Sequence, residues 1–305
     1  MSYYAHNVLS WIIFNAAILG IVGLDLGIFQ RKPHTPSCAE ALVWSVVWVT
    51  LAIMFGAWLS FSQGKEWALL FFTGYTLEKS LSLDNILVFA VIFQTLKIPS
   101  CYQHKILKWG IIGALIMRFL MIWSGVWLLE KFHFLMYFFG SMLILTGCKI
   151  IWTKGSKSSL EENSIWRWVQ KILPIDHSLN HGKFWIRRGE KVLATPLFVG
   201  LILVEFSDLV FAVDSIPAIF AITQDPFIIY TANIFAILGL RSLYFLLNKA
   251  LENVHSLKKG LSFILIFVGC KMMGLIKIST VNSLMIILIM LSIALLASFF
   301  PRKTS

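Results

Sequence analysis

Acidic side chains stand inside the most apolar stretches of this chain, where carboxylates are rarely found without a partner. They are Asp25, Glu78, Asp84, Glu205, Asp208 and Asp214. An acidic residue at the centre of a membrane helix costs about 2.5 to 3.5 kcal/mol on insertion scales. We therefore expect these carboxylates to face a polar or ion-binding interior. Asp25 is the outlying member, because it lies toward one end of its apolar stretch.

The acidic residues fall into two groups of similar pattern. In each group two acids stand six residues apart and an amide or hydroxyl follows: Glu78, Asp84 and Asn85 in one, Asp208, Asp214 and Ser215 in the other. On an ideal helix this spacing separates the two acids by about 120°, so a regular helix would not aim both at one ion. A kink or unwound turn beside Asp214 is predicted, because Pro217 disturbs the helix there. Glu205, three residues before Asp208, shares its face of the helix.

Carboxylate, amide and hydroxyl oxygens are hard ligands, typical of sites for Mn²⁺, Mg²⁺ or Ca²⁺. Protons compete with a metal for such carboxylates, which is itself a coupling mechanism. The alternative is an internal salt-bridge network in which Lys79, Arg118 and Arg241 only hold the bundle together. Six acids against three intramembrane bases leave a surplus of negative charge. A cation site is therefore favoured, with the two arginines as pairing or gating residues.

The rest of the sequence indicates that membrane helices hold these residues. Of the 305 residues, 58% are hydrophobic and only 13% are charged, and the mean hydropathy is +0.80, which excludes a soluble globular enzyme. Nine stretches are long and apolar enough to cross a bilayer as a helix. They are residues 8–30, 40–61, 67–96, 106–129, 132–152, 196–223, 227–247, 257–276 and 281–300. We predict an all-α, polytopic transmembrane bundle of about nine spans.

Lysine and arginine residues are concentrated in alternate loops between these spans. Because such residues gather on the cytoplasmic side, the pattern predicts an N-terminus outside and a C-terminus in the cytoplasm. The net charge of +11 therefore reports membrane orientation, and a nucleic-acid partner is not expected.

Two blocks of three spans look like copies of each other. Each contains the acid pair, then Arg118 or Arg241, then a Gly-Cys-Lys sequence that ends at Lys149 or Lys271. An odd number of spans per block predicts an inverted-topology repeat, as in many secondary transporters. Duplication can also serve a structural end, and Gly-Cys-Lys is a short match.

The predicted division of the chain follows from this repeat. It consists of residues 1–65 as a two-helix segment, 66–153 as repeat 1, 154–195 as a basic cytoplasmic loop, 196–277 as repeat 2, and 278–305 as a last helix and tail. Within the loop, residues 165–173 are typical of a short amphipathic helix on the anionic inner leaflet. That helix is expected to anchor the loop, with a regulatory or partner-binding role as the alternative.

Motifs of soluble catalysis are absent from the sequence, which contains no GxxxxGK[ST] phosphate loop, no HExxH and no nucleophile elbow. We expect neither an enzyme nor an organic cofactor.

Three segments carry a resemblance to a known family. The stretches Leu77 to Asn85, Val204 to Phe227 and Asn233 to Arg241 resemble the TerC family of integral membrane proteins, named for tellurite resistance, and the resemblance covers nearly the whole chain. It implies a transporter that exports Mn²⁺ from the cytoplasm across a bacterial cytoplasmic membrane. The competition of protons for the carboxylates then favours secondary-active exchange of the metal against protons. By motif position the resemblance implies the metal residues Glu78, Asp84, Asn85, Glu205, Asp208, Asp214 and Ser215. Additional ligand or coupling roles fall to Asp25, Ser207, Lys79, Arg118 and Arg241.

Other interpretations stay open at this point. Tellurite is an oxyanion that a carboxylate cluster would repel, so it is not expected as the transported ion. The sequence does not choose Mn²⁺ over Ca²⁺ or Mg²⁺, which leaves Ca²⁺/H⁺ exchange as an alternative. Some members of the family are assembly factors in photosynthetic membranes, so a membrane scaffold without transport is a further alternative. An organelle of bacterial descent could replace the bacterial membrane, and the oligomeric state is not predicted.

Overall fold

Ten helices and one short hairpin make up the part of the chain that the structure describes. The computed structural model describes residues 8–24, 37–132, 134–152, 182–188, 191–247, 254–276 and 278–299, and 86% of them are helical. The helices are α1 (Val8–Leu24), α2 (Cys38–Ser62), α3 (Lys65–Thr95), α4 (Ser100–Lys131), α5 (Leu135–Trp152), α7 (Pro196–Phe220), α8 (Pro226–Leu238), α9 (Leu240–Leu247), α10 (Val254–Met272) and α11 (Thr280–Phe299). The strands are β1 (Trp185–Arg188) and β2 (Lys191–Ala194).

Each apolar stretch identified in the sequence contains a helix, and the seventh contains two. Within the described ranges, four helical stretches are long and apolar enough to cross a membrane: Cys38–Ser62, Ser100–Gly125, Pro196–Phe220 and Pro226–Leu246. Shorter apolar helices add Leu9–Gly23, Tyr137–Trp152, Ser262–Met272 and Thr280–Ala294. The helical membrane fold is thus observed, whereas nine complete crossings stay a prediction.

The helix break lies in a different place from the one expected. Helix α7 runs without interruption from Pro196 to Phe220, with Pro217 inside it, so the unwound turn predicted beside Asp214 is wrong. Pro217 lies in the last turn of α7, where the loss of one backbone donor disturbs little of the remaining helix. The interruption lies instead at Gly239, which separates α8 from α9.

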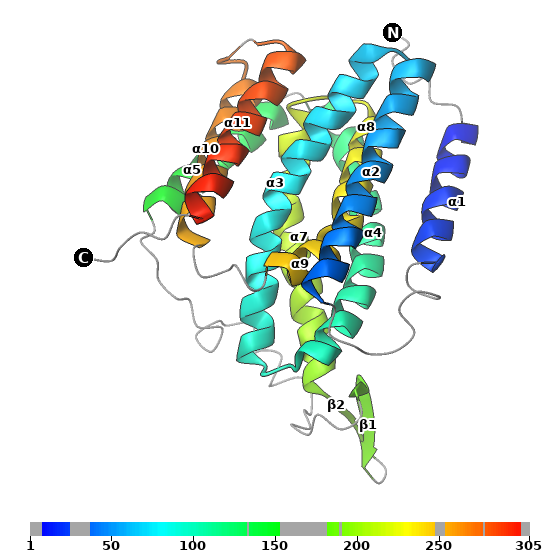
Figure 1. The fold of residues 1–305 in the computed structure, drawn as a ribbon. Coiled ribbons are helices and arrows are strands. Elements are labelled where there is room, and N and C mark those ends of the chain that lie inside the picture. Colours follow the sequence, from blue (N-terminus) through cyan, green and yellow to red (C-terminus); the bar gives the residue numbers. More distant parts are fainter. Residues whose placement is uncertain are drawn as a thin grey trace.

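A β-hairpin is the second departure from the all-α expectation. Strands β1 and β2 pair antiparallel, with Trp185 opposite Ala194 and Arg188 opposite Lys191. The Trp185 ring lies 4.0 Å, between centroids, from the ring of Phe198 in α7, so the hairpin is fixed to the start of that helix (Figure 1). The amphipathic helix expected at 165–173 lies outside the described residues.

Helix α8 is the innermost helix of the bundle. All of its residues from Phe227 to Leu238 are buried, because it packs against α3 and α4. Helix α7 packs against the same two helices. Helices α5, α10 and α11 form a second group beside α3 and α7 (Figure 1). The two helices that carry the acidic motifs, α3 and α7, therefore pack against each other inside the bundle.

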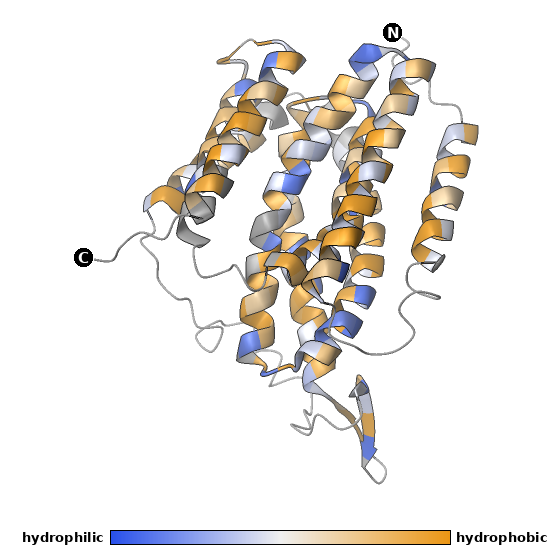
Figure 2. Ribbon diagram, in the orientation of Figure 1, coloured by the Kyte–Doolittle hydropathy of each residue, from blue (hydrophilic) through white to orange (hydrophobic). Residues whose placement is uncertain are grey.

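The outward surface of the helices is apolar (Figure 2). Large side chains such as Trp123, Leu145 and Ile293 expose more than half of their surface, which suits contact with lipid tails. Hydrophilic residues gather at helix ends and on the hairpin, with another patch part-way along α3 (Figure 2).

The packing of α5 against α10 follows the proposed repeat. The Cα of Gly147 faces the backbone of Ser262 and the side chain of Ile266, and the Cα of Gly269 faces Gly140 and Ile144 in the same way. Gly147 corresponds to Gly269, Ser262 to Gly140 and Ile266 to Ile144, and the two members of each pair are the same number of residues apart in the sequence. Such a pattern is expected if a two-fold operation exchanges the two blocks. The inverted repeat itself stays a prediction.

Candidate cation site

The guanidinium of Arg118 is the centre of a buried polar cluster. Arg118 belongs to α4, and its Nη1 donates to Glu78 Oε2 of α3 at 3.1 Å. Its Nη2 lies 3.4 Å from Asp208 Oδ1 of α7. Both Arg118 and Glu78 expose only 3% of their side chains. One cation therefore bridges an acid from each of the two predicted repeats.

Two neutral side chains complete the connection between α3 and α7. The Asn85 amide of α3 donates to Asp208 Oδ1 at 3.1 Å, and Arg118 Nη1 donates to the Ser215 hydroxyl of α7 at 3.0 Å. Both side chains are buried. Asn85 and Ser215 occupy equivalent positions in the two acidic motifs, and here they lie at the same cluster.

Glu78 and Asp208 each use one carboxylate oxygen for the contact with Arg118, and the other oxygen does not take part in it. Glu78 Oε1 and Asp208 Oδ2 are buried without a well-formed hydrogen bond in the described part of the chain. Asn233 of α8 lies beside Glu78, but neither atom of its amide reaches hydrogen-bond geometry. Buried oxygens of this kind are rare in folded proteins and require an explanation. They are suitable positions for ligands to a hard cation.

Glu205 also contacts α4, the helix that carries Arg118, but at a different position along that helix from the cluster. It lies one turn before Asp208 in α7, and its carboxylate lies against Gly113 of α4. A side chain at Gly113 would occupy the position of that carboxylate. Ser207 donates to the Val204 carbonyl of its own helix at 2.8 Å, so it is not aimed at the cluster.

Lys79 forms a hydrogen bond at the end of α8, next to the break between α8 and α9. Its ammonium donates to the carbonyl of Ala236 at 3.2 Å, in the last turn of α8. A Cβ at Gly239 would come within 2.6 Å of Lys79 Nζ, so a larger residue there would displace the ammonium. A cation at a helix C-terminus is stabilised by the exposed carbonyls there. This contact supports a structural role for Lys79.

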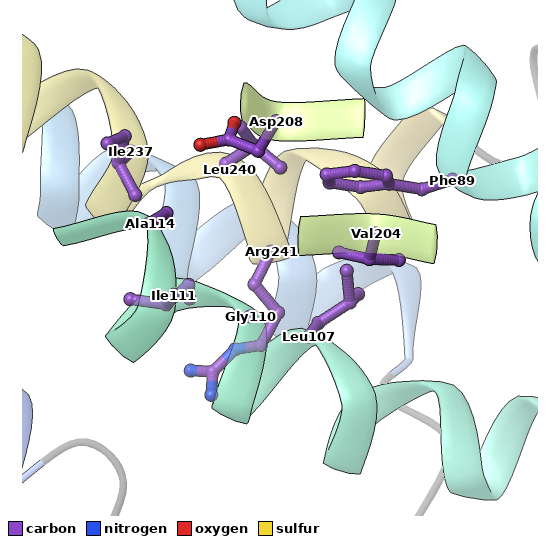
Figure 3. A pocket seen from close by; sticks show the side chains of 10 residues that line it. All are labelled: Phe89, Leu107, Gly110, Ile111, Ala114, Val204, Asp208, Ile237, Leu240 and Arg241. Atoms are coloured by element: carbon purple, nitrogen blue, oxygen red, sulfur yellow. The ribbon is translucent and has the colours of Figure 1, made fainter. Parts of the chain in front are cut away.

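A small cavity separates Arg241 from the cluster. It measures about 20 Å³ and is lined by Gly110, Ala114, Val204, Asp208 and Arg241 among others, which is room for about one water molecule. The carboxylate of Asp208 is at its edge, and the guanidinium of Arg241 points away from that carboxylate (Figure 3). Arg118 and Arg241, although equivalent in the repeat, therefore have different surroundings.

The structure brings together four of the seven predicted metal residues. These are Glu78, Asn85, Asp208 and Ser215. Asp84 and Asp214 lie in α3 and α7, but their side chains, like all of Asp25, are outside the described residues. Among the side chains that are described, no three of His, Cys, Asp or Glu are close enough to hold one metal ion.

Two residues of the site were missed in the sequence. Asn233 lies next to Glu78, and Gly113 makes room for Glu205. A signal for Asn233 existed, because it is an amide in the middle of the otherwise mostly apolar α8. No signal pointed to Gly113, because its role depends on which helix faces α7.

Buried charges joined across a bundle of apolar helices define an integral membrane protein of the polytopic helical class. The chain belongs to the TerC family, described as integral membrane proteins, whose pattern matches residues 62–305.

Several bacterial proteins are similar over most of their length. An uncharacterized membrane protein of Myxococcus xanthus is 48% identical over 96% of this chain and 92% of the relative. An uncharacterized membrane protein of Rickettsia felis is 42% identical over 97% of this chain and 99% of its own. A protein of Salmonella typhi, named as the membrane-bound redox modulator Alx, is 42% identical over 87% of this chain and 85% of its own. No solved structure is significantly similar.

Proposed function

We propose that this protein is a secondary-active transporter that exports a divalent cation, Mn²⁺ first among the candidates, from the cytoplasm. The observation that carries the proposal is the meeting of Glu78 and Asp208 at one buried guanidinium. In the described part of the chain, each acid keeps one oxygen without a well-formed hydrogen bond. A purely structural ion pair would be expected to satisfy those oxygens, because an unsatisfied buried carboxylate oxygen is destabilising.

The proposed ligands are Glu78, Asp84, Asn85, Glu205, Asp208, Asp214 and Ser215. All of them offer oxygen, which suits Mn²⁺, Ca²⁺ or Mg²⁺ better than softer metals. Mn²⁺ is preferred on the family resemblance, and protons are the proposed counter-ion because they compete for the same carboxylates. A transporter of this kind is neither an enzyme nor dependent on an organic cofactor.

We place the protein in the bacterial cytoplasmic membrane, with the N-terminus outside and the C-terminus in the cytoplasm. The relatives are bacterial. The hairpin, which contains Arg187 and Arg188, lies at the same end of the bundle as the start of α4 with Lys105 and Lys108 (Figure 1). A concentration of basic residues at one end is typical of the cytoplasmic side.

The test is time-resolved Mn²⁺ flux in proteoliposomes that contain the purified protein, with Ca²⁺ and Mg²⁺ as competitors. The decisive variant is Asp208→Asn. Its matched control is Asp225→Asn, because Asp225 caps α8 by accepting from the Ile228 amide at 2.9 Å, and asparagine caps a helix equally well. We expect saturable flux that is lost in Asp208→Asn and kept in Asp225→Asn.

The competing interpretations predict other results. Ca²⁺/H⁺ exchange predicts that Ca²⁺ flux exceeds Mn²⁺ flux and responds to a pH gradient. A membrane scaffold predicts no flux in the wild-type protein under any imposed gradient, with insertion intact. Absence of wild-type flux would therefore refute autonomous transport.

A further inference from the structure

Arg118 occupies the position between the two carboxylates that a transported cation would need. Its two terminal nitrogens lie 3.1 Å from Glu78 Oε2 and 3.4 Å from Asp208 Oδ1, and Ser215 accepts a further hydrogen bond at 3.0 Å. Every one of these partners is a proposed ligand. The guanidinium is thus bound as a cation would be, by residues from both α3 and α7.

The chemistry of the guanidinium makes it a permanent competitor for this position. Arginine keeps its charge at any physiological pH, and its planar fork can bind two carboxylates at once. A divalent ion bound to Glu78 and Asp208 would lie within a few ångströms of that charge. Repulsion at such a distance inside a bundle is strong, because little water is present to screen it.

Among the described residues, the cavity beside the cluster is too small for a hydrated metal ion next to the guanidinium. The cavity at the edge of Asp208 measures about 20 Å³, which is room for about one water molecule. Gly110 and Ala114, which line it, precede Arg118 on the same face of α4. Binding of a hydrated metal ion therefore requires the guanidinium to leave its carboxylates.

We propose that Arg118 is a built-in substitute for the transported cation, which neutralises Glu78 and Asp208 whenever the metal has been released. The inference rests on the proposed transport function and specifies one step of it. A carrier that has released its metal must return with its carboxylates compensated, since uncompensated buried charges are strongly unfavourable. Arg118 supplies that compensation for Glu78 and Asp208 and gives way when a metal ion binds. The exchange of metal for protons then falls to the other proposed carboxylates, such as Glu205, which Arg118 does not neutralise.

The equivalent arginine of the second repeat does not have this position. The guanidinium of Arg241 points away from Asp208 across the cavity (Figure 3). Because Arg241 does not lie between these two carboxylates, replacing Arg118 alone is enough to test the proposal.

Two modes of transport separate the return step from metal binding. Net efflux of Mn²⁺ into metal-free buffer requires the carrier to return without metal. Exchange of radioactive Mn²⁺ against unlabelled Mn²⁺, present on both sides, requires only the metal-bound carrier to cross. A residue needed for the return step alone affects the first mode and spares the second.

The experiment compares both modes in wild-type, Arg118→Gln and Arg118→Lys proteoliposomes, with size-exclusion profiles as the check on folding. We expect Arg118→Gln to lose net efflux by about tenfold or more while exchange stays within about threefold of the wild type. Arg118→Lys keeps a charge but not the fork, so it should recover part of the net efflux. If Arg118→Gln does not fold, Arg118→Lys decides, because it should still reduce net efflux more than exchange.

The outcomes distinguish this inference from the function on which it rests. Equal loss of both modes in a well-folded variant, or full retention of both, would overturn the role of Arg118 and leave transport intact. Absence of both modes in the wild-type protein would overturn the transport function, and the inference with it.

Discussion

The ion pairs of Arg118 should behave as one coupled unit in stability measurements. The perturbation is Glu78→Gln and Asp208→Asn, made singly and together. At an effective dielectric constant of 20, contacts of 3.1 and 3.4 Å correspond to about 5 kcal/mol each by Coulomb's law. A single replacement should destabilise by less, about 1 to 2 kcal/mol, because the amide oxygen still accepts a hydrogen bond and the second acid still balances the charge.

The double replacement removes that compensation. A buried guanidinium then has no carboxylate partner in the described part of the site, and breaking a buried pair in this way costs about 3 to 5 kcal/mol. The loss should therefore exceed the sum of the single losses by about 1 kcal/mol. Replacing Arg118 with methionine in the double variant should restore much of the stability, because the unpaired charge is removed.

The assay is thermal denaturation in one detergent at one scan rate, since unfolding of such a protein is usually irreversible. At about 2 °C per kcal/mol for a chain of this size, the single variants should lose about 2 to 4 °C and the double variant about 6 to 10 °C. Asp225→Asn is the control and should stay near the wild type. Losses that merely add, or a methionine variant that does not recover, would refute the coupling of these charges.

Four glycine substitutions test other close contacts, with Gly20→Ala as a common control, because a Cβ added at Gly20 would meet no described residue within 4 Å. Gly113→Ala should displace the neighbouring carboxylate of α7 and lower Mn²⁺ flux with normal expression; unchanged flux would argue against a role for that acid. Gly147→Ala and Gly269→Ala should each destabilise the protein by about 1 to 3 kcal/mol in thermal denaturation. In both variants the new methyl group would lie 2.7 Å from a backbone oxygen. Very different losses of stability would contradict equivalent packing of the two blocks. Gly239→Ala should push the lysine ammonium away from the end of α8 and lower the apparent melting temperature, and a neutral result would show that this contact contributes nothing.

Helix positions followed closely from the sequence, because hydrophobic length decides which segments can lie in a bilayer. Each predicted stretch contains a helix. The predicted break at Asp214 was wrong, since Pro217 lies near the end of α7, where a missing backbone donor disturbs little. The break at Gly239 was not predicted, because a single glycine is a weak signal in membrane helices, where glycine is common.

The hairpin of residues 185–194 was also not predicted. Its strands are four residues each and are held by pairing with each other and by the contact between Trp185 and Phe198. Short strands carry a weak sequence signal, and the ring contact depends on where α7 begins. The basic residues of the hairpin predict the cytoplasmic side of the membrane, which stays a prediction, but they did not predict the strands.

The amino-acid sequence was enough to predict a helical membrane protein with buried carboxylates, because charges in apolar spans are too unfavourable to occur without a partner. It also identified Glu78, Asn85, Asp208, Ser215 and Arg118 as members of one candidate site. The tertiary structure alone decided that Arg118, rather than Arg241, bridges the two acids. The two arginines have equivalent positions in the repeat, and only the packing of α4 between α7 and α8 determines which guanidinium reaches both carboxylates.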